Sequence, residues 1–182
     1  MNRVIKQFIA GVAIIAALQP MFAVPSMAQD RSEEYQLKAV LLSRLMSFVT
    51  WPQLGEGDPI TLCVAGQNPF AGQLEIVFAE SNVAVEMIGN QFGVLDSCNV
   101  LFISDSEIRN FESILDLVAD KPILTISDVP RFASSGGMIN LTFDNRRVRF
   151  LINKEEADAV GVRLSFQLLS LAEIVTTRSD RR

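Results

Sequence analysis

The sequence predicts a three-layer α/β domain with a mostly parallel sheet, helices on both faces, and an antiparallel C-terminal hairpin at the sheet edge. Two observations predict this class. Apolar runs of strand length alternate with helical patterns from residue 32 to about residue 133. Asp144 and Asn145 then separate two runs in which apolar and polar residues alternate, which is typical of a hairpin.

Residues 1–28 have the composition of a secretory signal peptide. Arg3 and Lys6 are basic, and an apolar stretch of about eleven residues follows, Phe8 to Leu18. A membrane-spanning helix needs roughly 20 apolar residues, so this stretch is too short to span. Ser26-Met27-Ala28 is a small-x-small cleavage site, and we expect cleavage after Ala28 and export. The alternative is an uncleaved membrane anchor.

The mature chain has the length and charge of one acidic domain. We expect a single domain over residues 29–177 and a disordered tail over residues 178–182. Removal of Arg3 and Lys6 leaves 14 basic and 21 acidic residues, a net charge of −7. An acidic exported protein is a poor candidate for binding nucleic acid or anionic membrane surfaces.

The first predicted helix covers Ser32 to Val49, with Ser32 as its N-cap. Trp51-Pro52 ends it, because the residue before a proline disfavours helical backbone. Its apolar face is broad enough to be covered on two sides. Core packing is one interpretation of that face. The other is a homodimer or partner interface that includes Leu41, Leu45 and Phe48.

The elements that follow alternate between strand and helix. Buried or alternating runs predict strands at residues 60–65, 83–88, 99–103 and 122–126. Helices are expected from Asn68-Pro69 to about Glu80, over Ile108–Ala119, briefly over Val129–Ala133, from near Lys154 to Gly161, and over Leu164–Val175.

Cys63 and Cys98 are the two cysteines of the chain. Export to an oxidising compartment makes a disulfide the expected state, with two buried free thiols as the alternative. A bridge requires Cα atoms within about 7 Å. The strand at residue 60 should then neighbour the strand at residue 99, which gives the order 83–60–99–122.

The hairpin has a predicted register. With Asp144-Asn145 as its loop, Leu141 faces Val148 and Ile139 faces Phe150, so both strands share an apolar face. The other face then pairs Asn140 with Arg149 and Thr142 with Arg147. Arg147 and Arg149 are either a solvated surface or a surface for an acidic partner.

The sequence argues against an enzyme. It contains no histidine, which excludes Ser-His-Asp and Cys-His catalysis and the usual zinc hydrolase sites. It also lacks the G-x-S-x-G, G-x-G-x-x-G and P-loop lysine motifs. We therefore expect no catalytic residues, no metal site and no cofactor.

Three predicted strands end in polar helix-start signals that would meet at one edge of a parallel sheet. Open α/β sheets bind ligands at this edge, and helix N-termini suit anions. These signals define a candidate ligand crevice, although helix capping alone also explains them. Its residues are Gly66, Asn68, Ser104, Asp105, Ser127 and Asp128.

Six segments of the mature chain together carry a family resemblance. They are EYQLKAVLLSRLMSFVTWP (34–52), LCVAGQNPF (62–70), CNVLFIS (98–104), PILTISDVPRFASSGGMINL (122–141), NRRVRFLIN (145–153) and GVRLSFQLLSLAEIV (161–175). These segments resemble the YfiR-like family of periplasmic proteins. They occur in the family's order and together span nearly the whole mature chain. No segment is a catalytic motif.

The resemblance implies a regulator. The best-known members of this family are dimeric periplasmic repressors that bind the periplasmic sensor domain of an inner-membrane diguanylate cyclase, which lowers cyclic-di-GMP and biofilm formation. An outer-membrane lipoprotein can sequester them. A small-ligand sensor, for an anion or a nucleotide, is the alternative.

The chain departs from the family in two places. Relatives can carry two disulfides, whereas this chain can form only the Cys63–Cys98 bridge, which matches the family's pair between the first and middle strands. Ser43-Arg44 stands where aromatic and Asn residues are frequent, so partner specificity is expected to differ.

Overall fold

A computed structural model describes residues 27–55, 57–144 and 147–178. The predicted fold class is confirmed. Seven strands form one mixed sheet in the order β3-β2-β4-β5-β6-β7-β9, and helices pack on both of its faces. The predicted signal peptide, apart from Met27 and Ala28, and the predicted tail, apart from Arg178, lie outside the described residues. No helix in the described ranges is long and apolar enough to cross a membrane.

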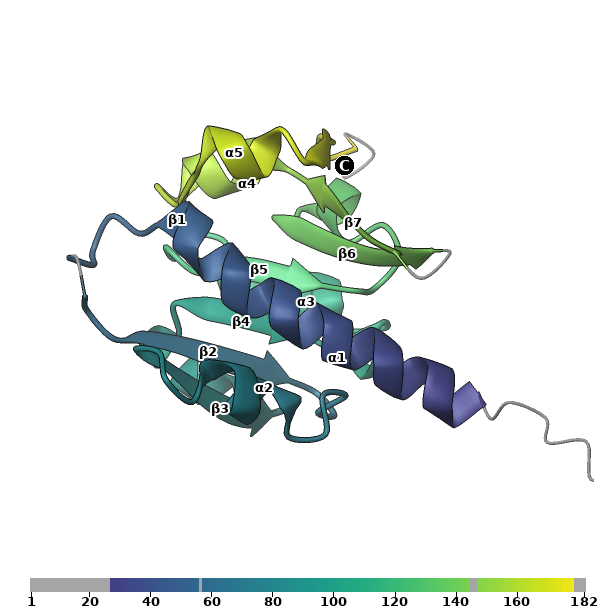
Figure 1. Cartoon of the computed structure of the whole chain (residues 1–182). Helices are drawn as coiled ribbons and strands as arrows, with labels where there is room; N and C mark the ends of the chain where they lie inside the picture. Colours follow the sequence, from purple (N-terminus) through teal and green to yellow (C-terminus); the bar gives the residue numbers. More distant parts are fainter. Residues whose placement is uncertain (1–26, 56, 145–146, 179–182) are drawn as a thin grey trace, which may run out of the picture.

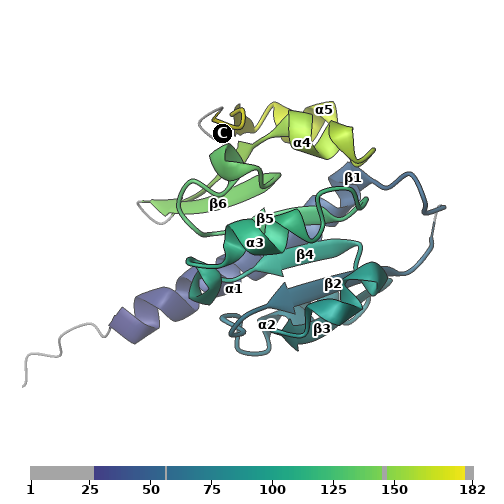
Figure 2. The same cartoon turned by 180° about the vertical axis from the view of Figure 1, so that it is seen from behind.

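The long helix α1 lies diagonally across one face of the sheet, with α2 beside it, and α3 covers the opposite face (Figures 1 and 2). The helices are α1 (Met27–Leu45), α2 (Gln73–Phe78), α3 (Phe111–Asp116), α4 (Lys154–Ala159) and α5 (Phe166–Leu169). The sheet strands are β2 (Ile60–Ala65), β3 (Val83–Gly89), β4 (Val100–Ile103), β5 (Leu124–Ser127), β6 (Ile139–Asp144), β7 (Arg147–Ile152) and β9 (Ala172–Ile174).

The predicted strand order around the disulfide is confirmed. Strand β2 pairs in parallel with β3 on one side and β4 on the other, and β4 pairs with β5. A disulfide joins Cys63 in β2 to Cys98, just before β4, with a Cα–Cα distance of 5.8 Å. Both sulfurs lie in the apolar layer under α3, so the bridge joins two central strands inside the core.

Helix α1 differs from its predicted boundaries at both ends. It begins at Met27, which places Ser32 inside the helix instead of at its N-cap. At the other end a 3-10 turn, Met46–Phe48, is followed by the short strand β1, Val49–Thr50. Strand β1 pairs with β8, Arg163–Leu164, which explains why the helical pattern stops earlier than predicted.

The predicted helix over Leu164–Val175 was wrong. This segment forms β8, the single-turn helix α5, whose N-cap Ser165 accepts a hydrogen bond from the Leu168 amide, and strand β9. Strand β9 pairs in parallel with β7. It therefore lies outside the hairpin, and the edge of the sheet is β9 and not β7.

The hairpin register is shifted by two residues from the prediction. Asp144 pairs with Arg147, Leu141 with Phe150 and Ile139 with Ile152. The predicted loop residue Asn145 lies outside the described residues. A shift of two preserves the alternation of faces, so the shared apolar face remains. The predicted pairing of Asn140 with Arg149 was wrong, because Thr142 pairs with Arg149.

Asn140 also departs from the predicted polar face. It is 1% exposed, and its side-chain amide donates to the carbonyl oxygens of Ser127 and Val129, each at 3.0 Å. These two bonds tie the start of the hairpin to the end of β5. The predicted helices after residues 68 and 107 are shorter than expected, and that at 129–133 is replaced by a 3-10 turn, Ala133–Ser135.

Candidate functional site

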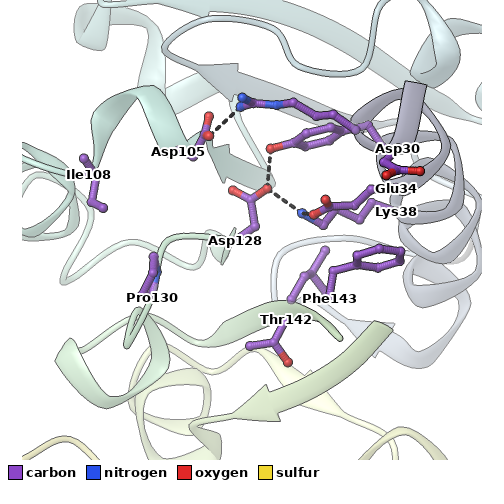
Figure 3. Close-up of a pocket in the computed structure, with 12 residues that line it drawn as sticks. Asp30, Glu34, Lys38, Asp105, Ile108, Asp128, Pro130, Thr142 and Phe143 are labelled. Carbon is purple, nitrogen blue, oxygen red and sulfur yellow. Dashed lines mark hydrogen bonds and ion pairs between the residues drawn. The ribbon is translucent and has the colours of Figure 1, made fainter. Parts of the chain in front are cut away.

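The main cavity lies where the N-terminal half of α1 passes the carboxyl ends of the central strands and the hairpin (Figure 3). It is an open hollow of about 750 Å³. Charged side chains line the α1 side and apolar side chains line the hairpin side. The lining residues are Asp30, Arg31, Glu34, Tyr35, Lys38, Asp105, Ile108, Asp128, Pro130, Leu141, Thr142 and Phe143.

Asp128 is the centre of the polar wall. It follows the last residue of β5, and its Oδ2 atom accepts hydrogen bonds from Lys38 Nζ at 2.7 Å and from the Tyr35 hydroxyl at 2.6 Å. The side chains of Lys38 and Asp128 are only 2% and 5% exposed. Lys38 also forms an ion pair with Glu34, one helical turn earlier. The buried Lys38–Asp128 pair fixes α1 to the end of the central sheet.

The other carboxylate oxygen of Asp128 is different. Oδ1 is buried and has no hydrogen-bond partner within the described part of the chain. A buried charged oxygen without a donor costs free energy, because it loses water and gains nothing in return. The carboxylate thus has one satisfied oxygen and one unsatisfied oxygen.

Tyr35 is held as a neutral phenol. Burial, the negative charge of Asp128 and the hydrogen bond to Asp128 all raise the pKa of Tyr35 above its ordinary value. Lys38 Nζ lies 4.4 Å from the centre of the Tyr35 ring, within cation–π range. The ring of Phe70 meets Tyr35 edge-on at 5.4 Å. Tyr35 is therefore a fixed hydrogen-bond donor.

An exposed ion pair lies at the rim of the cavity. Arg31 contacts Asp105 at 2.5 Å, and the two side chains are 58% and 43% exposed. Hydrogen bonding with Tyr35 and the charge of Asp105 raise the pKa of Arg31, which is a cation in any case. Exposed pairs contribute little to stability, so this rim is easier to rearrange than the Lys38–Asp128 pair.

A second, apolar groove of about 440 Å³ lies between the C-terminal end of α1, strand β7 and α5. Leu171 in its lining is 69% exposed, and Phe166 on α5 is 86% exposed. Large apolar side chains gathered on a surface are typical of protein contacts. The lining residues are Leu41, Arg44, Leu45, Ser47, Phe48, Phe150, Leu168 and Leu171.

Comparison with known families agrees with the sequence resemblance. A model of the YfiR/HmsC-like family matches residues 35–173. The chain belongs to the YfiR/HmsC-like family. The family match includes Tyr35, Lys38, Asp105 and Asp128 of the cavity lining, whereas Asp30, Arg31 and Glu34 precede the matched range.

Among solved structures, the chain is similar to a cystine C-S lyase, C-DES, in complex with its reaction product cysteine persulfide. The likeness has 11% sequence identity and a TM-score of 0.35. It covers 81% of this chain, which spans 51% of that one. A likeness of this size carries no argument about the YfiR/HmsC-like chain.

The structure brings together two of the six predicted crevice residues at the cavity. Asp105 and Asp128 line it. Asn68 instead stabilises a turn, where its side chain accepts a hydrogen bond from the Phe70 amide. The Ser127 hydroxyl donates a hydrogen bond to the Ile103 carbonyl oxygen at 2.6 Å and accepts one from the Val129 amide at 3.0 Å.

Gly66 and Ser104 also have structural roles. Ser104 is buried, and its hydroxyl lies 2.7 Å from that of Ser106. Gly66 has a φ of +81°, and a Cβ there would lie 2.4 Å from Ser106 Oγ. The strand ends therefore meet as predicted, but Gly66, Asn68, Ser104 and Ser127 have structural roles and do not line the cavity.

Sequence reasoning missed the contribution of α1 to this site. Arg31, Tyr35 and Lys38 have helical spacing, which places them on one side of α1. That spacing could have indicated a polar stripe on an otherwise apolar helix. It could not have indicated the partners, because Asp105 and Asp128 are 74 and 90 residues further along the chain.

The other predicted surfaces are elsewhere. Leu41, Leu45 and Phe48 line the apolar groove, although Leu45 is only 2% exposed and belongs mainly to the core. Arg147 and Arg149 are exposed on β7. The described residues contain no group of three or more His, Cys, Asp or Glu side chains that could hold a metal ion.

Proposed function

We propose that this protein is a periplasmic, non-enzymatic regulator that binds the periplasmic sensor region of an inner-membrane diguanylate cyclase and represses it. The supporting observation is the family match over residues 35–173. In this proposal the signal peptide is removed after Ala28 and the mature protein acts in the periplasm as a homodimer. An outer-membrane lipoprotein is a further candidate partner.

The arginines of β7 are the proposed contact for the cyclase. Arg147 and Arg149 alternate along the strand and are both exposed. The mature chain is acidic overall, so a local pair of arginines is a distinctive positive feature. Such a feature favours an acidic partner surface and speeds its association.

Deletion of the gene, followed by measurement of intracellular cyclic-di-GMP, tests the repressor role. We expect the concentration of cyclic-di-GMP to rise on deletion and to fall back to its original level when the wild-type chain is expressed. Expression of the Arg147→Glu/Arg149→Glu double variant should leave the concentration high. Arg163→Glu, at an exposed arginine of β8, should lower it as the wild-type chain does. An unchanged nucleotide level on deletion, in cells that normally make the protein, would refute repression.

The apolar groove is the proposed dimer surface. It combines half-buried residues, Leu41 and Phe48, with the exposed Leu171. Leu171→Arg should convert a dimer to a monomer in analytical ultracentrifugation, because it places a charge in an apolar contact. Ile76→Arg is the matched control, since Ile76 is 66% exposed on α2. A monomeric wild-type protein, or equal effects of the two variants, would exclude this surface.

A further inference from the structure

The unsatisfied oxygen of Asp128 is the strongest unexplained feature of the described residues. Oδ2 has two donors, Lys38 and Tyr35, whereas Oδ1 has none among the residues that the structure describes. The side chain is 5% exposed, so bulk water does not simply replace the missing donor. Native proteins rarely leave such groups unpaired, and an unpaired one calls for a bound water or ligand.

Asp128 belongs to the wall of the main cavity. In Figure 3 the carboxylate oxygen without dashed lines points away from Lys38, toward the side where Asp105 and Ile108 lie. The cavity volume of about 750 Å³ lies within the range of about 300–1,000 Å³ that is usual for small-molecule sites. An occupant of the cavity therefore lies beside the side chain whose buried oxygen needs a donor.

The charges of the wall favour a cation. Four carboxylates line the cavity, against the two cations Arg31 and Lys38, and both cations are already in ion pairs. An ionised carboxylate only accepts hydrogen bonds, so the ligand must supply the donor. A metal ion is a poor match, because no set of three or more metal ligands occurs in the described ranges.

The rest of the wall is apolar. Ile108 is 51% exposed, Pro130 is exposed in the loop after β5, and the half-buried Phe143 extends the apolar surface onto the hairpin. We propose that the cavity binds a small primary alkylamine, with its ammonium group donating to Asp128 Oδ1 and its alkyl chain against these side chains. The proposal does not rest on the regulatory function proposed above. It departs from the anion or nucleotide ligand that the sequence suggested.

Access requires a small rearrangement. Oδ1 itself exposes less than 1 Å², so the ammonium group can reach it only after part of the wall moves. The exposed Arg31–Asp105 pair at the rim is the part that rearranges most easily, since exposed ion pairs contribute little to stability. The Lys38–Asp128 pair is buried and stays in place.

Calorimetric titration of the folded mature chain with n-butylammonium, n-butanol and butyrate tests the proposal. The three probes have short alkyl chains of similar length and differ in the head group, which is an ammonium, a neutral hydroxyl or a carboxylate. We expect saturable binding of n-butylammonium at least about tenfold tighter than that of the other two, which is the usual size of a charge-assisted hydrogen bond. Equal binding of all three, or no saturable binding of n-butylammonium, would overturn the proposal and leave Oδ1 with water only.

Two variants at Ile108 test whether an ammonium group within the chain can replace the ligand at Asp128 Oδ1. Ile108→Lys should abolish n-butylammonium binding, because the new ammonium group competes for Oδ1. Ile108→Gln removes the same apolar contact but adds no ammonium group, so it should weaken binding only a few-fold. Both changes are at a half-exposed position, so folding is not at risk. Equal binding by the two variants would overturn the proposal.

Asp128→Asn removes the charge while keeping the shape, and it should weaken n-butylammonium binding at least about tenfold. Unchanged binding in a folded Asp128→Asn variant would place the amine elsewhere. If that variant does not fold, the Ile108 pair decides. A lysine-containing peptide that binds when n-butylammonium does not would also overturn the proposal, because the site would then serve a protein side chain.

Discussion

The Lys38–Asp128 ion pair gives the sharpest prediction about stability. Its side chains are 2% and 5% exposed, and the two charged atoms are 2.7 Å apart. Lys38→Met keeps most of the volume and removes the charge, which leaves the Asp128 carboxylate buried with only the Tyr35 hydroxyl as a donor. The loss of one partner from a buried pair costs about 3–5 kcal/mol of unfolding free energy.

This loss is large for one substitution. A domain of this size is stable by about 5–15 kcal/mol, and about 1 kcal/mol shifts its melting temperature by about 2–4 °C. Lys38→Met should therefore lower the melting temperature by about 6–20 °C. Urea unfolding followed by circular dichroism measures the free energy directly. Lys121→Met is the control, because the Lys121–Asp96 pair is 37% and 83% exposed and should change stability by about 1 kcal/mol or less.

The double variant Lys38→Met/Asp128→Asn tests the cause. If the uncompensated charge is responsible, the double variant should be more stable than the sum of the two single effects predicts, by about 0.5–3 kcal/mol. Strict additivity would show that the two residues act separately. A Lys38→Met variant as stable as Lys121→Met would refute the assignment of this pair as the anchor of α1.

Three further predictions concern other parts of the fold. Reduction of the Cys63–Cys98 bridge, which spans 35 residues, should lower the unfolding free energy by about 3–4 kcal/mol, and thiol titration of the denatured, unreduced chain should find no free thiol. Tyr35 is the single tyrosine, and its pKa is raised in the folded chain. The folded chain therefore keeps a proton that the unfolded chain loses above about pH 10, so the free energy of unfolding should fall as pH rises beyond that value. An ultraviolet titration in which the folded and unfolded chains ionise together would contradict this. Gly66→Ala should lower the free energy of unfolding by more than the roughly 1–2 kcal/mol of left-handed backbone strain, because its Cβ would lie 2.4 Å from Ser106 Oγ. Gly57→Ala is the control, since Gly57 also has a positive φ but has nothing within 4 Å of the added Cβ, and it should cost only that strain. Equal unfolding free energies of the two variants would rule out the close contact.

The candidate site could be predicted only in part. Asp105 and Asp128 were expected at the sheet edge because strand ends of a parallel sheet meet there, and both line the cavity. Lys38 was not expected there, since a lysine within an apolar helical pattern carries no sign of a buried partner. Its partner lies 90 residues away, and the two meet only because α1 crosses the sheet.

Local patterns determined the α/β class, the strands β2 to β5 and the two faces of the hairpin, because alternation along a strand fixes which side chains share a face. The same alternation cannot distinguish two strand registers that differ by two residues. In the folded protein Asp144 pairs with Arg147. Likewise, residues 164–175 have helical spacing, but pairing with β1 and β7 made short strands of Leu164 and Ala172–Ile174. Tertiary structure decided these points and the cavity, because the free energy of strand pairing and of burial depends on a partner that the local sequence does not contain.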